Sequence, residues 1–181
     1  IAAYGPPSTS GTRDAFNELM MTEGCSQNAE MKALKDSDKD KYEEVCTTIR
    51  TDGKYIEQGE NDNLIVQKLT SNPDHLGIFG YSYMEENSGR VQGINIGGVA
   101  PTYDTIASGE YPGARKLYFY VKKAHVGKVP GIQEYVNMFL QMAAEGGPLT
   151  KIGLITLPKA EYDAQVKGGA ELPNLSAADL K

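Results

Sequence analysis

The residues whose types and spacing could hold a ligand are Ser10-Gly11-Thr12-Arg13, placed where a helix is about to start. A Ser or Thr before a helix ordinarily caps it by accepting a backbone N–H. Here the hydroxyls exceed what a cap requires, because they are carried by Ser8, Thr9, Ser10 and Thr12. Gly11 lets a ligand approach the backbone, and free N–H groups, the helix dipole and the fork of Arg13 suit a tetrahedral oxyanion. From the residues alone, simple capping is the favoured interpretation and anion binding the alternative.

The elements that must position these residues alternate between helical and strand patterns. Helical spacing predicts helices over residues 13–24, over 60–74 with Asn61 or Asp62 as N-cap, and over 131–147. Apolar or β-branched runs predict strands at the following segments: LGIFGYSYM (76–84), VQGINIGGV (91–99) and KLYFYVKK (116–123). Helices alternating with strands predict an α/β fold with a helix-covered sheet. The turn-rich SGEYPGARK (108–116) is the clearest internal boundary.

Composition excludes several classes of function. The 181 residues carry a net charge of −6 and 40% hydrophobic residues, which predicts a folded core and argues against a nucleic-acid partner. No apolar run approaches the roughly 20 residues that span a bilayer. The chain starts without Met or a signal-peptide pattern, so we expect a processed, trimmed or truncated end. His75 and His125 stand far apart, in no zinc-ligand or nucleophile context, so we expect no metal, no cofactor and no enzyme.

Cys25 and Cys46 bracket a polar stretch rich in Lys and Asp. There are two interpretations: the cysteines are buried free thiols, or they form a disulfide that ties this excursion to the rest of the chain. From the residues alone, the two interpretations are nearly equally favoured. Other polar candidates favour structural roles. We expect Asn61 and Asn63 to cap a helix, and His75 to be a solvated turn residue.

A resemblance changes the balance at the opening motif. Five segments, in order, resemble the phosphate-binding proteins of bacterial phosphate ABC importers: YGPPSTSGTRDAF, RTDGKYIEQGENDNLIVQKL, LGIFGYSYMEEN, GVAPTYDTIASGEYPGARKLYFYVKK and PGIQEYVNMFL. The resemblance implies a two-lobed periplasmic binding protein whose chain crosses twice between lobes, with the ligand clamped in the cleft. The function it implies is binding inorganic phosphate outside the cytoplasmic membrane and delivering it to an ABC permease.

The resemblance also assigns the ligand-binding residues. The family's Ser-Gly-Thr maps onto Ser10, Gly11 and Thr12. Many members place an arginine four residues before that serine, where this chain has Pro6, so Arg13 is the expected substitute. Thr9 is a further candidate, and so is Asp14, either as a first-turn acid or as a proton acceptor that selects phosphate over sulfate. Another oxyanion, such as sulfate, molybdate or a sugar phosphate, and a non-binding scaffold fragment are the alternatives.

The domain organisation follows from the same resemblance. Residues 1–111 look like the second lobe, and residues 112–181 like the return segment that contributes to the first lobe. The rest of the first lobe is missing from the sequence and belongs either to the same protein or to a separate chain. Because the family is secreted to the periplasm, the resemblance favours a Cys25–Cys46 disulfide.

Overall fold

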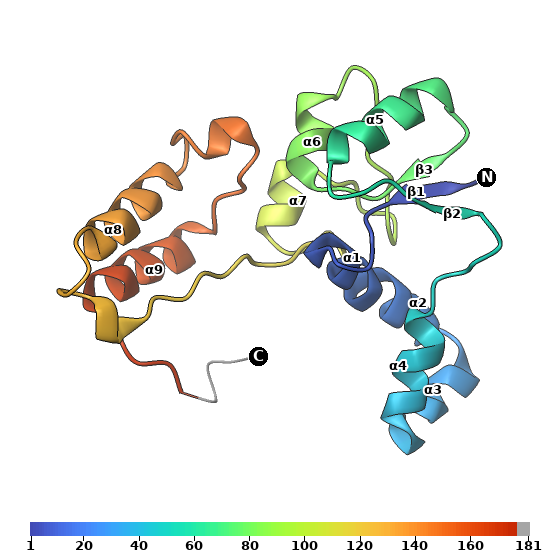
Figure 1. Ribbon diagram of the computed structural model, residues 1–181, viewed down its shortest axis with the longest axis horizontal. Coiled ribbons are helices and arrows are strands. Elements are labelled where there is room, and N and C mark those ends of the chain that lie inside the picture. Colours follow the sequence, from blue (N-terminus) through green and yellow to red (C-terminus); the bar gives the residue numbers. More distant parts are fainter. Residues whose placement is uncertain (177–181) are drawn as a thin grey trace. The chain divides into compact units, whose positions relative to one another are not determined.

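The computed structural model describes residues 1–176 and divides into two compact units, Ile1–Arg115 (unit 1) and a second that begins at Lys116 (unit 2). The division falls inside the turn-rich segment 108–116. Figure 1 labels the helices and strands of both units. Within the described residues, no helix is long and apolar enough to cross a membrane.

Unit 1 is built on a small parallel sheet. Its strands are β1 (Ala3–Gly5), β2 (Tyr55–Glu57) and β3 (Leu76–Gly77), in the order β2-β1-β3. Tyr4 of the central strand is aligned with Ile56 on one side and Gly77 on the other. Parallel pairing requires a crossover between neighbouring strands, and helices supply it here. The predicted α/β class is confirmed.

Helix α5 (Asp62–Ser71) covers the sheet. Asn61 caps it, since its Oδ1 accepts a hydrogen bond from the backbone N–H of Asn63 at 3.0 Å, as predicted. Ile65 and Val66 are buried, and α5 packs against β1 and β3 (Figure 1). Burying such side chains contributes about 1.5 to 3 kcal/mol each. The sequence predicts an apolar face of Leu64, Ile65 and Leu69, but Leu64 is 44% exposed, so Ile65 and Val66 anchor the helix.

A helical run near the N-terminus leads into the excursion between the cysteines. It comprises α1 (Gly11–Phe16), the π-helical η1 (Asn17–Thr22) and α2 (Glu23–Cys25), which follow one another without a break. The predicted helix over 13–24 is confirmed, with a start two residues earlier.

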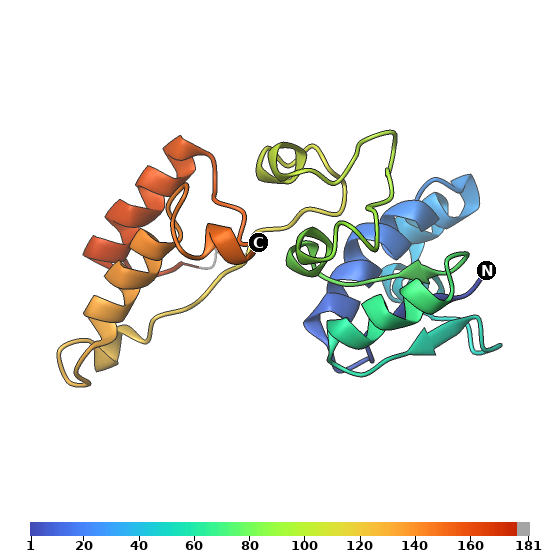
Figure 2. The ribbon, with the colours of Figure 1, turned by 90° about the horizontal axis from the view of Figure 1, so that it is seen from above.

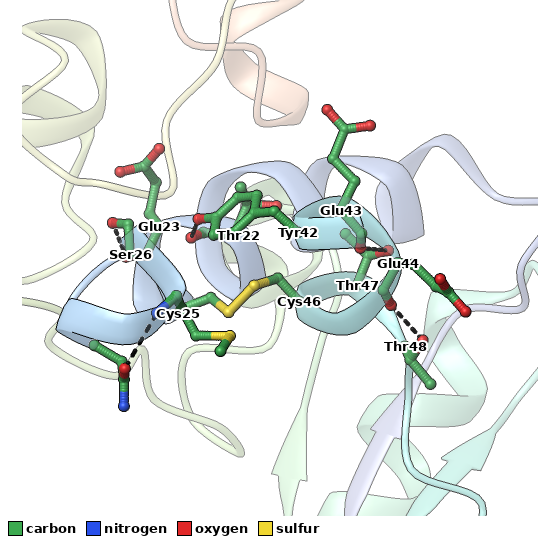
Figure 3. Close-up of a disulfide and its surroundings, with 12 residues drawn as sticks. Thr22, Glu23, Cys25, Ser26, Tyr42, Glu43, Glu44, Cys46, Thr47 and Thr48 are labelled. Atoms are coloured by element: carbon green, nitrogen blue, oxygen red, sulfur yellow. Dashed lines mark hydrogen bonds between the residues drawn. A yellow bond between two sulfur atoms is a disulfide. The ribbon is translucent and has the colours of Figure 1, made fainter. Parts of the chain in front are cut away.

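The excursion between the cysteines is a helical hairpin of α3 (Ala29–Ser37) and α4 (Lys39–Thr47), which lie side by side. Helix α3 has no buried residue, whereas Tyr42 and Cys46 of α4 are buried. The Cys25–Cys46 disulfide that the resemblance favoured is present, and the Tyr42 hydroxyl donates to the Thr22 carbonyl at 2.7 Å (Figure 3). These two links hold the hairpin to the helical run α1–η1–α2.

Two predicted strands of unit 1 take another form. Only Leu76–Gly77 of LGIFGYSYM is a strand, and Tyr81–Glu86 forms helix α6. VQGINIGGV contributes only an isolated bridge between Ile96 and Val99. Gly97 and Gly98 have φ of 60° and 85°, a left-handed conformation that turns the chain within this segment, so the predicted strand is wrong. Helix α7 (Tyr103–Ala107) follows, with Thr102 as its cap.

Unit 2 centres on a pair of helices. Helix α8 (Ile132–Met142) confirms the prediction, and α9 (Lys159–Glu171) lies beside it (Figure 2). The short 3₁₀ turns η2 (Lys123–His125) and η3 (Thr150–Ile152) precede and follow α8.

The predicted strand at residues 116–123 is not part of a sheet in unit 2. The segment is not assigned to any strand, and Leu117, Tyr118 and Tyr120 are each more than 60% exposed. A strand needs a partner for its backbone groups, and the described residues of unit 2 provide none.

Candidate functional site

The start of α1 is a capped helix end with an exposed glycine. Ser10 has extended backbone angles (φ −88°, ψ 132°), and its Oγ accepts a hydrogen bond from the Thr12 N–H at 3.3 Å. The N–H groups of Arg13 and Asp14 bond to the Ser10 carbonyl. Within residues 1–176 no hydrogen bond accounts for the Gly11 N–H, and Gly11 is exposed. The capping interpretation is confirmed for Ser10, and Gly11 leaves one donor for a ligand.

Ser10 can cap and bind at once. A hydroxyl carries one donor and two acceptor lone pairs, so an Oγ that accepts from Thr12 keeps its own O–H for an anion. The side chain is nonetheless largely enclosed, since Ser10 is 8% exposed. Thr12 is half-buried.

The structure places Arg13 away from the exposed point where the sequence led us to expect it. Arg13 is 7% exposed, and its Nη1 donates to the Pro6 carbonyl at 2.9 Å. The guanidinium lies 4.4 Å from the ring centroid of Tyr55, and Nη1 is 3.6 Å from Glu57 Oε1. A buried charge is costly unless it is paired and hydrogen-bonded, and the backbone oxygen, the ring and the carboxylate meet that need.

A different arginine reaches the helix start. Nη2 of Arg115 donates to the Gly11 carbonyl at 3.2 Å, across 104 positions of sequence, and this contact is exposed. A side chain on residue 11 would meet Arg115 Nη2 at 3.9 Å. The sequence had marked this segment only as a boundary. No local spacing signals a contact across 104 residues, so sequence reasoning missed Arg115.

Carboxylates rim the same loop. The Thr9 hydroxyl donates to Glu60 Oε1 at 2.9 Å, and Asp14 is exposed in the first turn of α1. Burial raises the pKa of Asp62, and the charge of Glu60 adds to this, while the Gly80 N–H opposes it by a hydrogen bond. Negative charge at the rim means that an anion here depends on directed donors rather than on the field of the whole chain.

Of the other sequence candidates, His75 differs from expectation and Asn61 and Asn63 do not. His75 lies at a turn, as predicted, since its N–H bonds to the Asn72 carbonyl at 3.0 Å. It is not solvated as predicted, because its ring stacks on Tyr4 with ring centroids 5.5 Å apart and its Nδ1 is buried. The chain segment around β3 carries His75 onto the central strand. Asn63 donates its backbone N–H to Asn61, so both belong to the cap of α5, as expected.

A comparison with family models settles the fold family. The model described as the PBP superfamily domain matches residues 1–142. The chain belongs to the PBP superfamily.

Curated relatives of this PBP superfamily member include proteins named PstS and SphX. Phosphate-binding protein PstS of Staphylococcus saprophyticus subsp. saprophyticus is 27% identical over 170 residues, which cover 91% of this chain and 44% of the relative. Protein SphX of Synechococcus elongatus is 29% identical over 171 residues, which cover 91% of this chain and 42% of the relative. Phosphate-binding protein PstS of Staphylococcus haemolyticus is 26% identical over 172 residues, which cover 92% of this chain and 45% of the relative. The resemblance to phosphate-binding proteins is thereby confirmed.

The chain spans less than half the length of these relatives. No solved structure gave a significant match.

Proposed function

We propose that this chain binds inorganic phosphate at the start of α1, as part of a protein that delivers phosphate to an ABC importer. The observation that carries the proposal is the contact between Arg115 and the exposed Gly11: Nη2 of Arg115 lies 3.2 Å from the carbonyl oxygen of Gly11. Relatives matched over 91% of the chain and named for phosphate binding support phosphate as the anion. They also support binding rather than catalysis.

The proposed contacts follow from the donors at this helix start. The Gly11 N–H and the hydroxyls of Ser10 and Thr12 bond to phosphate oxygens, and Arg115 supplies the exposed positive charge. Thr9 and Asp14 stand at the rim, where Asp14 would accept the proton of hydrogen phosphate. Sulfate has no such proton at neutral pH, so this contact would disfavour sulfate.

Calorimetric titration of the intact protein with inorganic phosphate, and separately with sulfate, tests the proposal. We expect Arg115→Gln to raise the Kd for phosphate by about tenfold to a hundredfold, since a charge-assisted hydrogen bond contributes about 1.5 to 3 kcal/mol. Arg90→Gln is the matched control, because Arg90 is also exposed but bonds to Asn87 and Thr70. Absence of heat with phosphate would refute the proposal. Equal affinity for phosphate and sulfate would show that the site binds oxyanions in general and does not select phosphate.

We further propose a periplasmic location. The Cys25–Cys46 disulfide supports it, since disulfides persist in oxidising compartments. The ABC permease is the partner that this location and the relatives' names imply.

The lobe assignment is part of the same proposal: residues 1–111 form one lobe, and residues 112–181 contribute to another that further sequence completes. Unit 2 supports it with an apolar groove of about 340 Å³ between the segment 119–122 and the start of α8, lined in part by Phe119, Tyr120, Ile132 and Tyr135. Exposed aromatic surface of this kind marks a surface that packs against something else.

Amide exchange tests the lobe assignment. We expect residues 117–122 to be protected in a protein that includes the residues completing the lobe, and unprotected in residues 1–181 alone. Unprotected amides in the longer protein would contradict the assignment.

A further inference from the structure

We propose that Arg13 and Tyr55 are positioning residues for the anion site, acting through the Pro6 carbonyl and not by contact with the ligand. This inference rests on the proposed function for its ligand. It differs from the sequence expectation, in which Arg13 itself binds phosphate.

The Pro6 carbonyl is held by two donors from different elements. The Tyr55 hydroxyl of β2 donates to it at 2.8 Å, and Nη1 of Arg13 in α1 donates at 2.9 Å. Pro6 is fully buried, so its carbonyl oxygen depends on these protein donors. The two side chains also hold each other, because the guanidinium lies 4.4 Å from the Tyr55 ring centroid. Burial raises the pKa of Tyr55, which keeps its hydroxyl protonated and able to donate.

The backbone at Gly5 is shaped to admit this clamp. A methyl group on residue 5 would lie 2.7 Å from Cζ of Tyr55, which is closer than real contacts allow. Tyr55 therefore reaches Pro6 only because the last residue of β1 has no side chain. Glu57, two residues further on the same strand, places its Oε1 3.6 Å from Arg13 and partly neutralises the guanidinium.

Pro6 is where the strand gives way to the binding loop. From Pro7 the chain turns, with the Ser10 N–H bonded to the Pro7 carbonyl at 3.0 Å, and then enters α1 through the Ser10 cap. Arg13 stands in the first turn of that helix, so its bond to Pro6 closes the loop 6–13 upon itself. A loop fixed at both ends presents Ser10, Gly11 and Thr12 without reordering when an anion binds, and this lowers the cost of binding.

The sharpest variant is Tyr55→Phe, which removes the hydroxyl and keeps the ring under Arg13. Tyr42→Phe is the matched control, since Tyr42 also donates its hydroxyl to a backbone carbonyl, that of Thr22, in the disulfide hairpin. Both variants lose one neutral hydrogen bond, so both should lower the unfolding midpoint to a similar extent. Titration of the intact protein with inorganic phosphate should show a Kd about fivefold higher for Tyr55→Phe alone. An unchanged Kd for Tyr55→Phe, or an equal rise for Tyr42→Phe, would overturn the inference.

Arg13 variants separate positioning from direct contact. Arg13→Lys keeps one donor for Pro6 and should retain more affinity than Arg13→Met. Because Arg13 and Tyr55 act on one carbonyl, the losses of Arg13→Met and Tyr55→Phe should not sum in the double variant. Losses that sum would assign Arg13 to the ligand, as the sequence suggested.

Amide exchange tests the clamp without a ligand, so it distinguishes failure of this inference from failure of phosphate binding. The Ser10 and Thr12 amides should exchange faster in Tyr55→Phe than in wild type. Their exchange rates in Tyr42→Phe should equal those in wild type. Unchanged exchange in both would overturn the inference even if wild type binds phosphate. If Tyr55→Phe exchanges faster than wild type but wild type gives no heat with phosphate, the positioning role of Tyr55 is retained and phosphate is rejected as the ligand.

Discussion

The helical hairpin α3–α4 offers the clearest perturbation, because one covalent bond and one buried tyrosine hold it. We expect the double variant Cys25→Ala, Cys46→Ala to lower the free energy of unfolding of unit 1. The bond closes a loop with a sequence separation of 21. Loop-closure entropy for a loop of that length gives about 3 kcal/mol at 25 °C.

Urea unfolding followed by circular dichroism measures this loss. With a slope of about 1 to 3 kcal/mol per molar urea, a loss of 3 kcal/mol moves the midpoint down by about 1 to 3 M. Reductant should move the wild-type midpoint by a similar amount and leave the double variant unchanged, which serves as the control. A loss below about 1 kcal/mol would refute the reasoning from loop entropy.

The loss should also have a location. Helix α3 has no buried residue, whereas α4 keeps Tyr42, with its hydrogen bond to Thr22 (Figure 3). Amide exchange in the double variant should therefore rise first over Ala29–Ser37 and less over Lys39–Thr47. Uniform acceleration over both helices would show that the hairpin opens as one body.

Two adjacent glycines of α9 give a matched pair: Gly169→Ala would place a methyl against Leu140 and 3.2 Å from Val136 of α8, so it should destabilise unit 2 by about 1 to 3 kcal/mol. Gly168→Ala meets no atom within 4 Å and should stabilise by up to about 1 kcal/mol, both read from thermal unfolding. The hydrogen bonds from Arg50 lower the pKa of Asp52 from its ordinary 3.8 to about 2. Because the folded-state pKa is depressed, the pair favours the folded state above pH 4 and loses this effect as pH falls through 2. An NMR titration of the Asp52 carboxyl should return to about 4 in Arg50→Gln, and a midpoint that stays near 2 would contradict this cause.

The elements that the sequence predicted are those with strong local signals. Helix α5 has an Asn cap, an apolar face with Ile65 and Val66, and a proline after its end, and α8 has an apolar face along its whole length. The sheet was harder, since β1, β2 and β3 have at most three residues each. A period of two cannot be recognised in so few residues, and only tertiary contacts make them strands.

The excursion between the cysteines shows a different limit. Its helices are rich in charged residues, and α3 has no buried residue, so no helix was predicted there. Yet capping signals were present: Asn28 accepts from the N–H groups of Glu30 and Met31, and Asp38 accepts from Lys41. A reading that weighted caps above apolar faces would have predicted both helices.

In the candidate site, too, local features could be predicted from the sequence and long-range contacts could not. The role of Ser10 as a cap could be predicted, because capping depends on residues two or three positions apart. The placement of the two arginines could not. Arg13 is drawn inward by Tyr55 and Pro6, which lie 42 positions later and 7 positions earlier, and Arg115 arrives from 104 positions away.

The two arginines differ in what their charge can do at this helix start. Arg13 is 7% exposed, and its guanidinium is shared among a carbonyl, an aromatic ring and a carboxylate, so little of its charge is left for a ligand. Arg115 is exposed and bonded to the Gly11 carbonyl, and in the proposed site a charge-assisted bond to an anion would replace a bond to water. In a chain with a net charge of −6, long-range attraction opposes an anion, so binding must come from donors held in place. In the proposed site, the buried Arg13 would hold the loop in place through Pro6, and the exposed Arg115 would supply the positive charge.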